Sequence, residues 1–356
     1  MKPLTCSRSF RAGLAFILFA ASQAFADRIV LFAGGGTSGL PAPAKDALLR
    51  EPFGTEFDEK GNAWIVEMVS GNRLLKVSAE GILTHVAGRP ESGFSGDGGP
   101  GLEAQFHGPH NLVVLRGGRI LVGDTWNGRV REVDASSAKV GTLPGFDVPV
   151  ARAKGAGPYC ITADPSGAKL YIADLTQVWE LDIKSGVSRR IAGNGKKGIP
   201  QDGSLAVEAP LVDPRAVAPD KLGNLYILER GGHALRVVDK DGRIRTVVNA
   251  SGKGGSHGDG GPALEAALNG PKHLCVDRDD SVLIADAENN LVRRYVPRTG
   301  RLERVAGTGK KGASGLGGAP TACELARPHG VTVHPATGEL YITDSYNNRV
   351  LKIVRD

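Results

Sequence analysis

Short apolar runs alternate with polar turns along most of the chain, and the same arrangement returns at intervals of 49 to 57 residues. The unit is clearest after Pro271, where polar turns separate the runs HLCVD, VLIAD, LVRRYV and LERVAG. Each run is short, rich in β-branched or aromatic residues, and bounded by Gly, Asn, Asp or Pro, which is the pattern of strands joined by turns. Each unit therefore predicts a four-stranded antiparallel sheet.

Six copies of this unit follow one another, each with a proline at its start and an acid fifteen or sixteen residues later. The prolines are Pro52, Pro109, Pro158, Pro214, Pro271 and Pro328, and the acids are Glu67, Asp124, Asp174, Glu229, Asp286 and Asp344. After each proline, apolar residues recur with a period of two, which excludes a helical solenoid. Repeats of this length with four strands each predict an all-β fold, the six-bladed β-propeller.

The two ends of the repeat array complement each other. The last copy ends at Asp356 after three strands, and RIVLFAG at residues 28–34 resembles fourth strands such as ILTHVAG at residues 82–88. We expect the N-terminal strand to complete the last blade and so remove an open sheet edge. Residues 27–356 are therefore predicted to be one propeller domain, in which each blade packs on its neighbours.

Residues 1–26 have the pattern of a secretory signal peptide. A basic start precedes the apolar run AGLAFILFA, and AFA at residues 24–26 offers a cleavage site. The run is too short for a membrane span, although an uncleaved anchor is the alternative. The predicted location is exported, periplasmic or secreted, after cleavage near Ala26. The mature chain is expected to have no membrane span and to be a monomer.

Its three cysteines (Cys160, Cys275 and Cys323) are expected to be unpaired and mostly buried, with a Cys275–Cys323 disulfide as a less favoured alternative.

Charge excludes one class of partner. Removing Lys2, Arg8 and Arg11 from the 44 basic residues leaves 41, against 38 acidic residues. This balance is too mild for a nucleic-acid-binding protein, and basic runs interleaved with aromatic residues are missing. Nucleic acid is therefore not expected as a partner.

Several segments resemble the NHL repeat of bacterial exported proteins. They are GDGGPGLEAQFHGP at 96–109, GDGGPALEAALNGP at 258–271 and YITDSYNNRVLKI at 341–353. The resemblance covers essentially the whole mature chain and implies a six-bladed propeller. It does not imply one reaction, because NHL propellers include protein-binding, RNA-binding and catalytic members. Two departures are the link LPGFDVPVARAKGAGP between the second and third copies, which lacks GDGG, and Leu316, which replaces the Asp of that motif.

The repeated acids are expected to be structural, because they occur in every copy. A carboxylate at this place is predicted to accept backbone N–H groups of the turn that follows. Asp97, Asp202 and Asp259 in the linkers are expected to cap their own turns. A calcium site there is less favoured, because the loops lack the alternating oxygen ligands that calcium loops use.

The residue after each proline differs from copy to copy. These residues are Phe53, His110, Tyr159, Arg215, Lys272 and His329. Each is predicted to start an innermost strand, so the six should surround one mouth of the central channel, where such variety is typical of a ligand-binding surface. His110, Arg215, Lys272 and His329 put up to four cationic or ionisable groups at the mouth, and the charge of the histidines is expected to respond to small pH changes near neutrality. These groups favour an anionic ligand, and the Arg215 guanidinium offers a fork for a carboxylate. His233 is expected on the same face.

Two of these residues raise the possibility of a metal site. His110 and His329 follow prolines, as do the zinc-binding histidines of peptidyl-hydroxyglycine amidating lyases, NHL propellers that this chain resembles more weakly. Those enzymes use three Pro-His units, whereas the third position here is Arg215, which cannot bind a metal. Catalytic zinc takes three protein ligands. No cofactor is firmly implied, and zinc or calcium at the two histidines stays an open alternative.

The sequence favours a binding module for a protein or a small anionic ligand at the channel-mouth face. The alternative is a metal-assisted lyase or lactone hydrolase with its site in the same mouth, and a structural role in cell-surface assembly is a third hypothesis. No catalytic residue is assigned, because the chain has no GxSxG, HExxH or P-loop motif.

Overall fold

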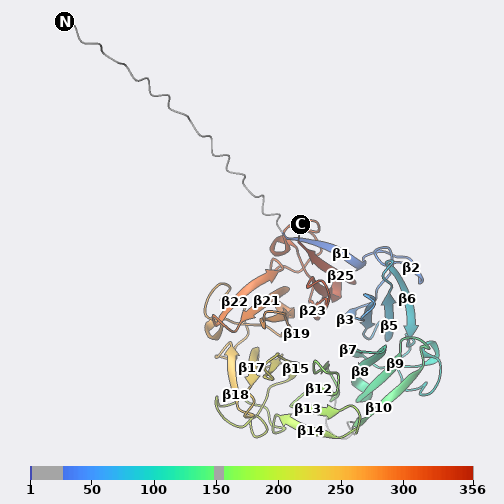
Figure 1. Cartoon of the computed structure of the whole chain (residues 1–356), viewed down its shortest axis with the longest axis horizontal. Helices are drawn as coiled ribbons and strands as arrows, with labels where there is room; N and C mark the ends of the chain where they lie inside the picture. Colours follow the sequence, from blue (N-terminus) through green and yellow to red (C-terminus); the bar gives the residue numbers. More distant parts are fainter. Residues whose placement is uncertain (2–26, 148–155, 356) are drawn as a thin grey trace.

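Six antiparallel β-sheets form a closed ring, which confirms the predicted six-bladed β-propeller (Figure 1). The computed structural model describes Met1, residues 27–147 and residues 156–355. The predicted signal peptide therefore lies outside the described residues except for Met1, as does much of the link between the second and third blades. No helix among the described residues is long and apolar enough to cross a membrane.

The strands follow the predicted repeat. Blade 1 contains β3 (Pro52–Phe57), β4 (Ala63–Glu67), β5 (Arg73–Val77) and β6 (Ile82–Ala87), with the short β2 (Ala42–Pro43) at its outer edge. Blade 2 contains β7 (Pro109–Leu115), β8 (Arg119–Asp124), β9 (Arg129–Asp134) and β10 (Val140–Asp147). Blade 3 contains β11 (Cys160–Ala163), β12 (Lys169–Asp174), β13 (Gln177–Asp182) and β14 (Ser188–Ala192).

The remaining blades have the same order. Blade 4 contains β15 (Pro214–Pro219), β16 (Leu225–Glu229), β17 (Ala234–Val238) and β18 (Ile244–Val248). Blade 5 contains β19 (His273–Val276), β20 (Val282–Asp286), β21 (Leu291–Val296) and β22 (Arg301–Ala306). Blade 6 contains β23 (Gly330–Val333), β24 (Leu340–Asp344) and β25 (Arg349–Val354). The 3₁₀ turns are η1 (Gly101–Glu103), η2 (Thr125–Asn127), η3 (Ala263–Glu265), η4 (Ala287–Asn289), η5 (Pro320–Ala322) and η6 (Ser345–Asn347).

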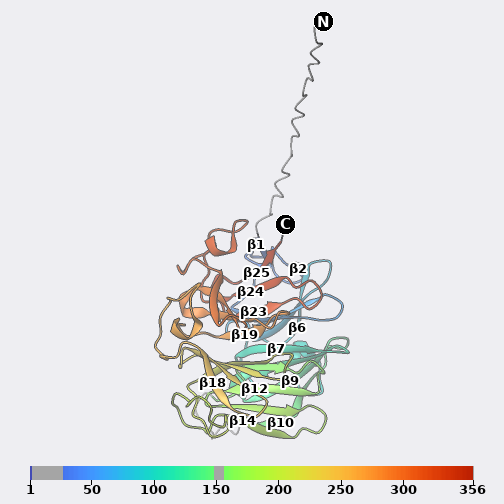
Figure 2. The same ribbon diagram turned by 60° about the vertical axis from the view of Figure 1, so that its left-hand side comes forward.

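The N-terminal strand closes the ring. β1 (Arg28–Gly34) pairs antiparallel with β25, so that Ile29 lies opposite Ile353. Blue β1 and red β25 are neighbours in Figure 1 and again in the turned view of Figure 2. Ile29 is fully buried, among apolar residues of blades 5 and 6. β1 therefore completes the sheet of blade 6, as the sequence predicts.

The hydrophobic core lies between neighbouring blades. One cluster joins Ile65 and Leu75 of blade 1 to Tyr341 and Val350 of blade 6. Another joins Ile227 and Leu235 of blade 4 to residues of blades 3 and 5. Because alternate residues of a strand point to opposite faces of a sheet, each blade has two apolar faces, one for each neighbour. Stability therefore depends on contacts between adjacent blades.

The six repeated acids are structural, but their partners differ from the prediction. Each accepts the backbone N–H of a residue in the linker that enters its own blade, seventeen or eighteen residues earlier. For example, Asp286 accepts from Asn269 at 2.8 Å, and Asp344 accepts from Ala326 at 2.7 Å. The acid therefore fixes the incoming linker rather than capping the following turn. Blade 3 does both, since Asp174 also accepts from Leu175.

An arginine on the third strand holds most of these acids. Arg236 pairs with Glu229 at 2.7 Å, and Arg349 pairs with Asp344 at 2.7 Å. Burial still raises the pKa of Asp286 to about 6 even beside Arg293, because desolvation outweighs the attraction of the guanidinium. These pairs are internal parts of the scaffold and do not line the channel.

The linker aspartates also have partners beyond their own turns. Asp97 pairs with Arg131 at 2.7 Å, and Asp259 pairs with Arg293 at 2.7 Å and with Arg304 at 2.9 Å. In blade 4, Asp202 accepts the backbone N–H of Thr246 at 2.8 Å. The expectation that these acids cap their own turns is therefore incomplete, because they fix each linker to the blade that it enters.

Cys160, Cys275 and Cys323 are free thiols, as predicted, and Cys275 is only partly buried.

A left-handed residue after the second strand connects each of several blades to the next. Asn72, Asn290 and Asn348 have positive φ, and their Oδ1 atoms accept the backbone N–H of Gly108, Arg327 and Glu51, respectively. His233 takes this position in blade 4, and its Nδ1 accepts from Gly270 at 3.0 Å. We call these side chains the blade tethers. His233 thus has a structural role, and it does not extend the ring of residues that line the mouth pocket.

Candidate functional site

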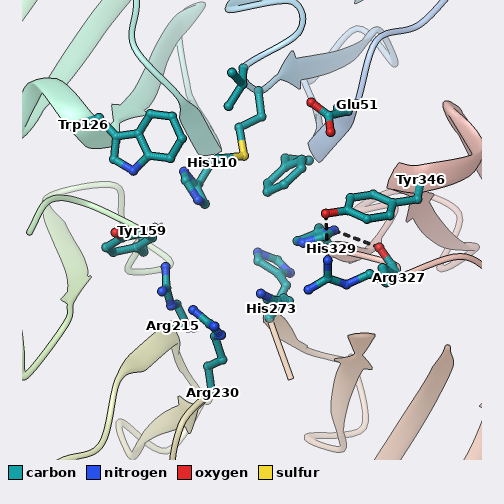
Figure 3. A pocket seen from close by; sticks show the side chains of 14 residues that line it. Glu51, His110, Trp126, Tyr159, Arg215, Arg230, His273, Arg327, His329 and Tyr346 are labelled. Atoms are coloured by element: carbon teal, nitrogen blue, oxygen red, sulfur yellow. Dashed lines mark hydrogen bonds between the residues drawn. The ribbon is translucent and has the colours of Figure 1, made fainter. Parts of the chain in front are cut away.

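A pocket of about 320 Å³ lies at one mouth of the central channel, and the six residues after the repeat prolines all line it. Phe53 and Arg215 belong to innermost strands, and Tyr159 and Lys272 directly precede theirs. Figure 3 shows labelled members of this set, His110, Tyr159, Arg215 and His329, converging from different blades. We call this cavity the mouth pocket. The structure thus brings the predicted ring together, and a role for it in ligand binding stays a prediction.

Eight further residues line the mouth pocket and were not among the sequence candidates. They are Glu51, Met68, Val69, Trp126, Arg230, His273, Arg327 and Tyr346. Most come from three columns of the repeat: the residue before the proline and the two residues after the repeated acid. Val69, Trp126 and Tyr346, for instance, all lie two places after that acid. The two columns after the acid differ in every copy, and the column before the proline holds a charged residue in three copies and glycine in the others; this variation is the signal that could have identified them.

Two of the three histidines that line the mouth pocket, His110 and His329, are neutral and have the same hydrogen-bond arrangement. His110 Nδ1 lies 2.8 Å from the Gly108 carbonyl oxygen, and His329 Nδ1 lies 2.8 Å from the Arg327 carbonyl oxygen. A carbonyl only accepts, so each Nδ1 carries the proton and each Nε2 keeps its lone pair. Burial, with help from nearby cations, lowers the pKa of His110 to about 3 and that of His329 well below its usual value.

This protonation state corrects one premise of the sequence analysis. The histidines do not add positive charge to the mouth near neutral pH, and their charge does not respond to small pH changes there. Phe53 packs on both rings, stacked on His329 at 4.0 Å between centroids and edge-on to His110 at 5.3 Å. The histidines therefore form an aromatic, hydrogen-bond-accepting part of the wall.

Three arginines of the pocket already have acidic partners. Arg215 pairs with Asp213 at 2.8 Å, and Arg230 reaches the same carboxylate at 3.4 Å. The Arg215 guanidinium also stacks on Tyr159, 3.7 Å from its ring centroid, and the side chain is only 11% exposed. The bidentate fork predicted for Arg215 is thus partly used within the protein. Its removal would also disturb packing.

Arg327 occupies the opposite side of the pocket. Its guanidinium pairs with Glu288, donates to the Tyr346 hydroxyl at 2.8 Å, and lies 4.8 Å from the Tyr346 ring centroid. Tyr346 and Trp126 are about 40% exposed at the rim. Two accessible aromatic surfaces therefore flank the entrance, one from blade 2 and one from blade 6.

Lys272 is the cation without a partner. Its ammonium forms no ion pair or hydrogen bond with any residue that the structure describes, and the nearby charges of Arg230, Arg215 and Arg327 oppose its protonation. Burial, followed by these three charges, lowers the pKa of Lys272 to about 7, and the weaker attraction of Glu288, which is paired with Arg327, offsets only part of this. An anion in the pocket would relieve both penalties, because a negative charge stabilises the ammonium form.

A hydrogen bond across the channel forms the floor of the mouth pocket. Asn111 of blade 2 donates from Nδ2 to His273 Nε2 of blade 5 at 3.0 Å, and these blades are opposite each other in the ring. His273 Nδ1 lies 3.2 Å from the Val331 carbonyl oxygen, and Asn111 Oδ1 accepts from Ile161 N–H. Burial lowers the pKa of His273 to about 4, which keeps it neutral and able to accept from Asn111. We call this pair the channel crossbar.

The fit of a metal ion to the mouth pocket is incomplete. Each free Nε2 of His110 and His329 is a suitable nitrogen donor, and a carbonyl bonded to Nδ1 is a common support for a metal-binding imidazole. No group of three His, Cys, Asp or Glu side chains within the described ranges is arranged to hold a metal. Two histidines would leave a catalytic zinc one protein ligand short.

Comparison with known proteins identifies the repeat. Residues 325–353 match the family NHL repeat. The chain is 26% identical over 271 residues to Protein SUPPRESSOR OF QUENCHING 1, chloroplastic, of Arabidopsis thaliana, an alignment covering 70% of this chain and 25% of that protein. It is 23% identical over 338 residues to NHL repeat-containing protein 2 of Gallus gallus, covering 82% of this chain and 45% of that protein. The chain thus spans less than half the length of these relatives.

Solved structures of similar fold include proteins with different activities. An auxiliary nutrient binding protein from Bacteroides thetaiotaomicron aligns with a TM-score of 0.67 and 16% identity, covering 93% of this chain and 77% of that one. A virginiamycin B lyase from Staphylococcus aureus aligns with a TM-score of 0.53 and 15% identity, covering 92% and 85%. At these identities the likeness concerns the fold.

Proposed function

We propose that this chain, an NHL-repeat six-bladed β-propeller, is an exported binding protein that holds a small anionic ligand in the mouth pocket. The observation that carries the proposal is Lys272, an unpaired ammonium in a pocket where three arginines also oppose its charge. Buried charges are costly unless they are paired, so an anionic partner would lower the free energy of this site. The nutrient-binding propeller of similar fold is consistent with such a role.

The surroundings of Lys272 indicate what kind of anion would fit. Trp126 and Tyr346 offer flat apolar surfaces at the rim, and the neutral His110 and His329 offer acceptors for hydroxyl or N–H groups. A carboxylate attached to an aromatic or sugar-like ring would use all three features. A carboxylate displayed by a protein partner would use the same contacts.

The proposal is tested by titrating benzoate into the protein and following Trp fluorescence or heat. We expect Lys272→Met to weaken benzoate binding at least tenfold, while Lys60→Met, at an exposed turn outside the mouth pocket, should leave it unchanged. Affinity of the parent should fall as the pH rises from 6 to 8, since Lys272, with a pKa of about 7, loses its proton over this range. Lys272→Arg should bind with little pH dependence.

Two results would contradict this assignment. Equal benzoate affinity of Lys272→Met and the parent would exclude Lys272 as the anion contact. The absence of saturable binding for benzoate, acetate and phosphate alike would remove the small-anion proposal and leave a protein partner.

A metal-assisted lyase or lactone hydrolase is the second candidate, favoured by the free Nε2 atoms of His110 and His329. These two nitrogens would hold the metal, which would supply Lewis-acid polarisation of a carbonyl or ether oxygen. The protein's own contribution would be to orient an anionic substrate through Lys272. Metal analysis of the purified protein tests this candidate: a stoichiometric ion that is lost in both His110→Ala and His329→Ala would favour it over simple binding.

A further inference from the structure

A second cavity, of about 350 Å³, lies at the other end of the channel. The ends of the innermost strands line it, whereas the residues at their starts line the mouth pocket. His273 borders both cavities, so the channel crossbar separates them. We call this second cavity the far pocket. Its size is within the range of pockets that hold small molecules.

The two ends of the channel have opposite charge character. Four cations line the mouth pocket, whereas no Lys or Arg is among the described residues that line the far pocket. Its charged groups are the carboxylates of Glu56 and Asp164. Asp164 is used within its own turn, where its oxygens accept from Ser166 and from the Lys169 N–H. Glu56 is the carboxylate left facing the cavity.

Glu56 has little support from the protein. Its side chain accepts from the Thr332 hydroxyl at 3.3 Å and forms no ion pair with any described residue. Burial raises the pKa of Glu56 to about 7, while the bonds from Thr332 and the Phe57 backbone oppose the rise. About half of the wall is apolar and includes four valines from three different blades, Val113, Val114, Val276 and Val333.

The other titratable groups facing Glu56 do not compensate its charge. Cys160 and Cys275 are thiols whose pKa values are raised by burial, so they stay neutral near pH 7. His273 is also neutral, and its Nε2 accepts from Asn111 in the channel crossbar. Asp164 carries the same sign as Glu56. A positive charge at this place can therefore come only from outside the described residues.

We propose that the far pocket is a second binding site, for a small organic cation whose ammonium group pairs with Glu56 and whose apolar part contacts the valine wall. Pairing would convert a poorly solvated carboxylate into a hydrogen-bonded ion pair. A metal ion fits less well, since the described residues offer no set of three metal-binding side chains here. This site is independent of the anion site proposed for the mouth pocket.

The test is a calorimetric or NMR titration with n-butylammonium chloride in a buffer that contains neither amines nor phosphate. We expect saturable binding at pH 8 and at least a tenfold weaker affinity at pH 5.5, where Glu56 is protonated. Glu56→Gln should reduce the affinity at pH 8 at least tenfold. Glu59→Gln is the matched control, because Glu59 lies three residues away with a side chain 69% exposed, and it should bind like the parent.

A second measurement does not depend on a variant. The Glu56 carboxyl carbon, followed by ¹³C NMR, should titrate with a lower pKa in the presence of n-butylammonium, by about one unit for each tenfold preference of the cation for the ionised form. An unchanged Glu56 pKa would overturn the proposal, as would equal binding of n-butanol, which would make the pocket merely apolar. Displacement of n-butylammonium by millimolar calcium chloride would overturn the assignment to an organic cation.

Discussion

At the scale of single residues, the channel contains two groups whose pKa values are shifted toward neutrality from opposite directions. Burial lowers the pKa of Lys272 at one end and raises the pKa of Glu56 at the other, in each case because the charged form loses water. His110 and His329 beside Lys272, which the sequence predicts to be the pH-sensitive groups, are neutral over the same range. Charge changes near pH 7 therefore belong to a lysine and a glutamate.

Glu56 should make the stability of the unliganded protein depend on pH. Its pKa is about 7 when folded and 4.5 as the ordinary value, so the folded state holds the proton more tightly. This contribution is fully present below pH 4.5 and is lost as the pH rises through 7, on the order of 1–3 kcal/mol in total. Glu56→Gln should therefore gain stability relative to the parent between pH 5 and pH 8, measured by urea unfolding.

Glu59→Gln again provides the comparison, since an exposed carboxylate contributes little to this dependence. Parallel stability curves for the parent and Glu56→Gln across this pH range would show that Glu56 is better solvated than its surroundings imply.

At the scale of secondary-structure elements, the blades are connected by a small set of repeated side-chain bonds. The acid at the end of the second strand accepts a backbone N–H of the linker that enters its own blade, as Asp286 does from Asn269. The blade tether after that strand accepts a backbone N–H just before the first strand of the next blade, as Asn290 does from Arg327. Both bonds end on residues that line the mouth pocket or lie one to three places before a residue that does. The scaffold therefore fixes the position of the mouth-pocket wall, while the side chains of the wall are free to differ.

The blade tethers should be measurable one at a time. Asn72 is 1% exposed; it accepts from Gly108 N–H at 2.9 Å and donates to the carbonyl groups of Val69 and Pro90. Asn72→Ala would leave these groups unpaired and place alanine at positive φ. We expect a loss of about 2–3 kcal/mol in the free energy of unfolding.

His233→Asn is the matched variant, because asparagine already forms this bond in three other blades. It should stay within about 1 kcal/mol of the parent. A loss as large as that of Asn72→Ala would mean that His233 contributes more than the bond to Gly270.

The elements also explain what sequence reasoning reached and what it missed. The proline register placed the six predicted mouth residues at one pocket, because a residue at a fixed place in every blade must lie at a fixed height in the channel. Sequence reasoning missed Arg230, Trp126 and Arg327 because these residues lie on turns outside the strands. Whether a turn residue reaches the pocket depends on how the next blade packs, which one repeat does not reveal. The neutral state of His110 depends on burial by side chains from several blades, which one repeat does not reveal.

At the scale of the whole molecule, the ring has one seam. β1 and β25 meet there, and β1 supplies the outer strand of blade 6 together with the buried Ile29. Each of the other blades that the structure describes takes its four main strands from consecutive segments of the chain. The seam is thus the place where closure depends on segments from the two ends of the array.

Removing β1 should therefore damage the entire ring. A variant starting at Thr37 would leave β25 with an unpaired edge and remove apolar contacts to blades 5 and 6. We expect aggregation or the loss of a single cooperative thermal transition, measured by calorimetry and light scattering. A variant starting at Asp27 keeps β1 and is the control. If the Thr37 variant melts like that control, β1 is dispensable for closure.

The seam also determines when the protein can finish folding during its synthesis. β1 leaves the ribosome before any blade has formed, and its partner β25 is the last of the described strands to be made. The intermediate blades can stack on one another as they emerge, as repeat units do. β1 must nevertheless wait, unpaired, for nearly the whole of translation. A nascent chain stalled before β25 would expose the edge of β1 and the apolar face of an incomplete blade, which makes truncated products substrates for chaperones and proteases.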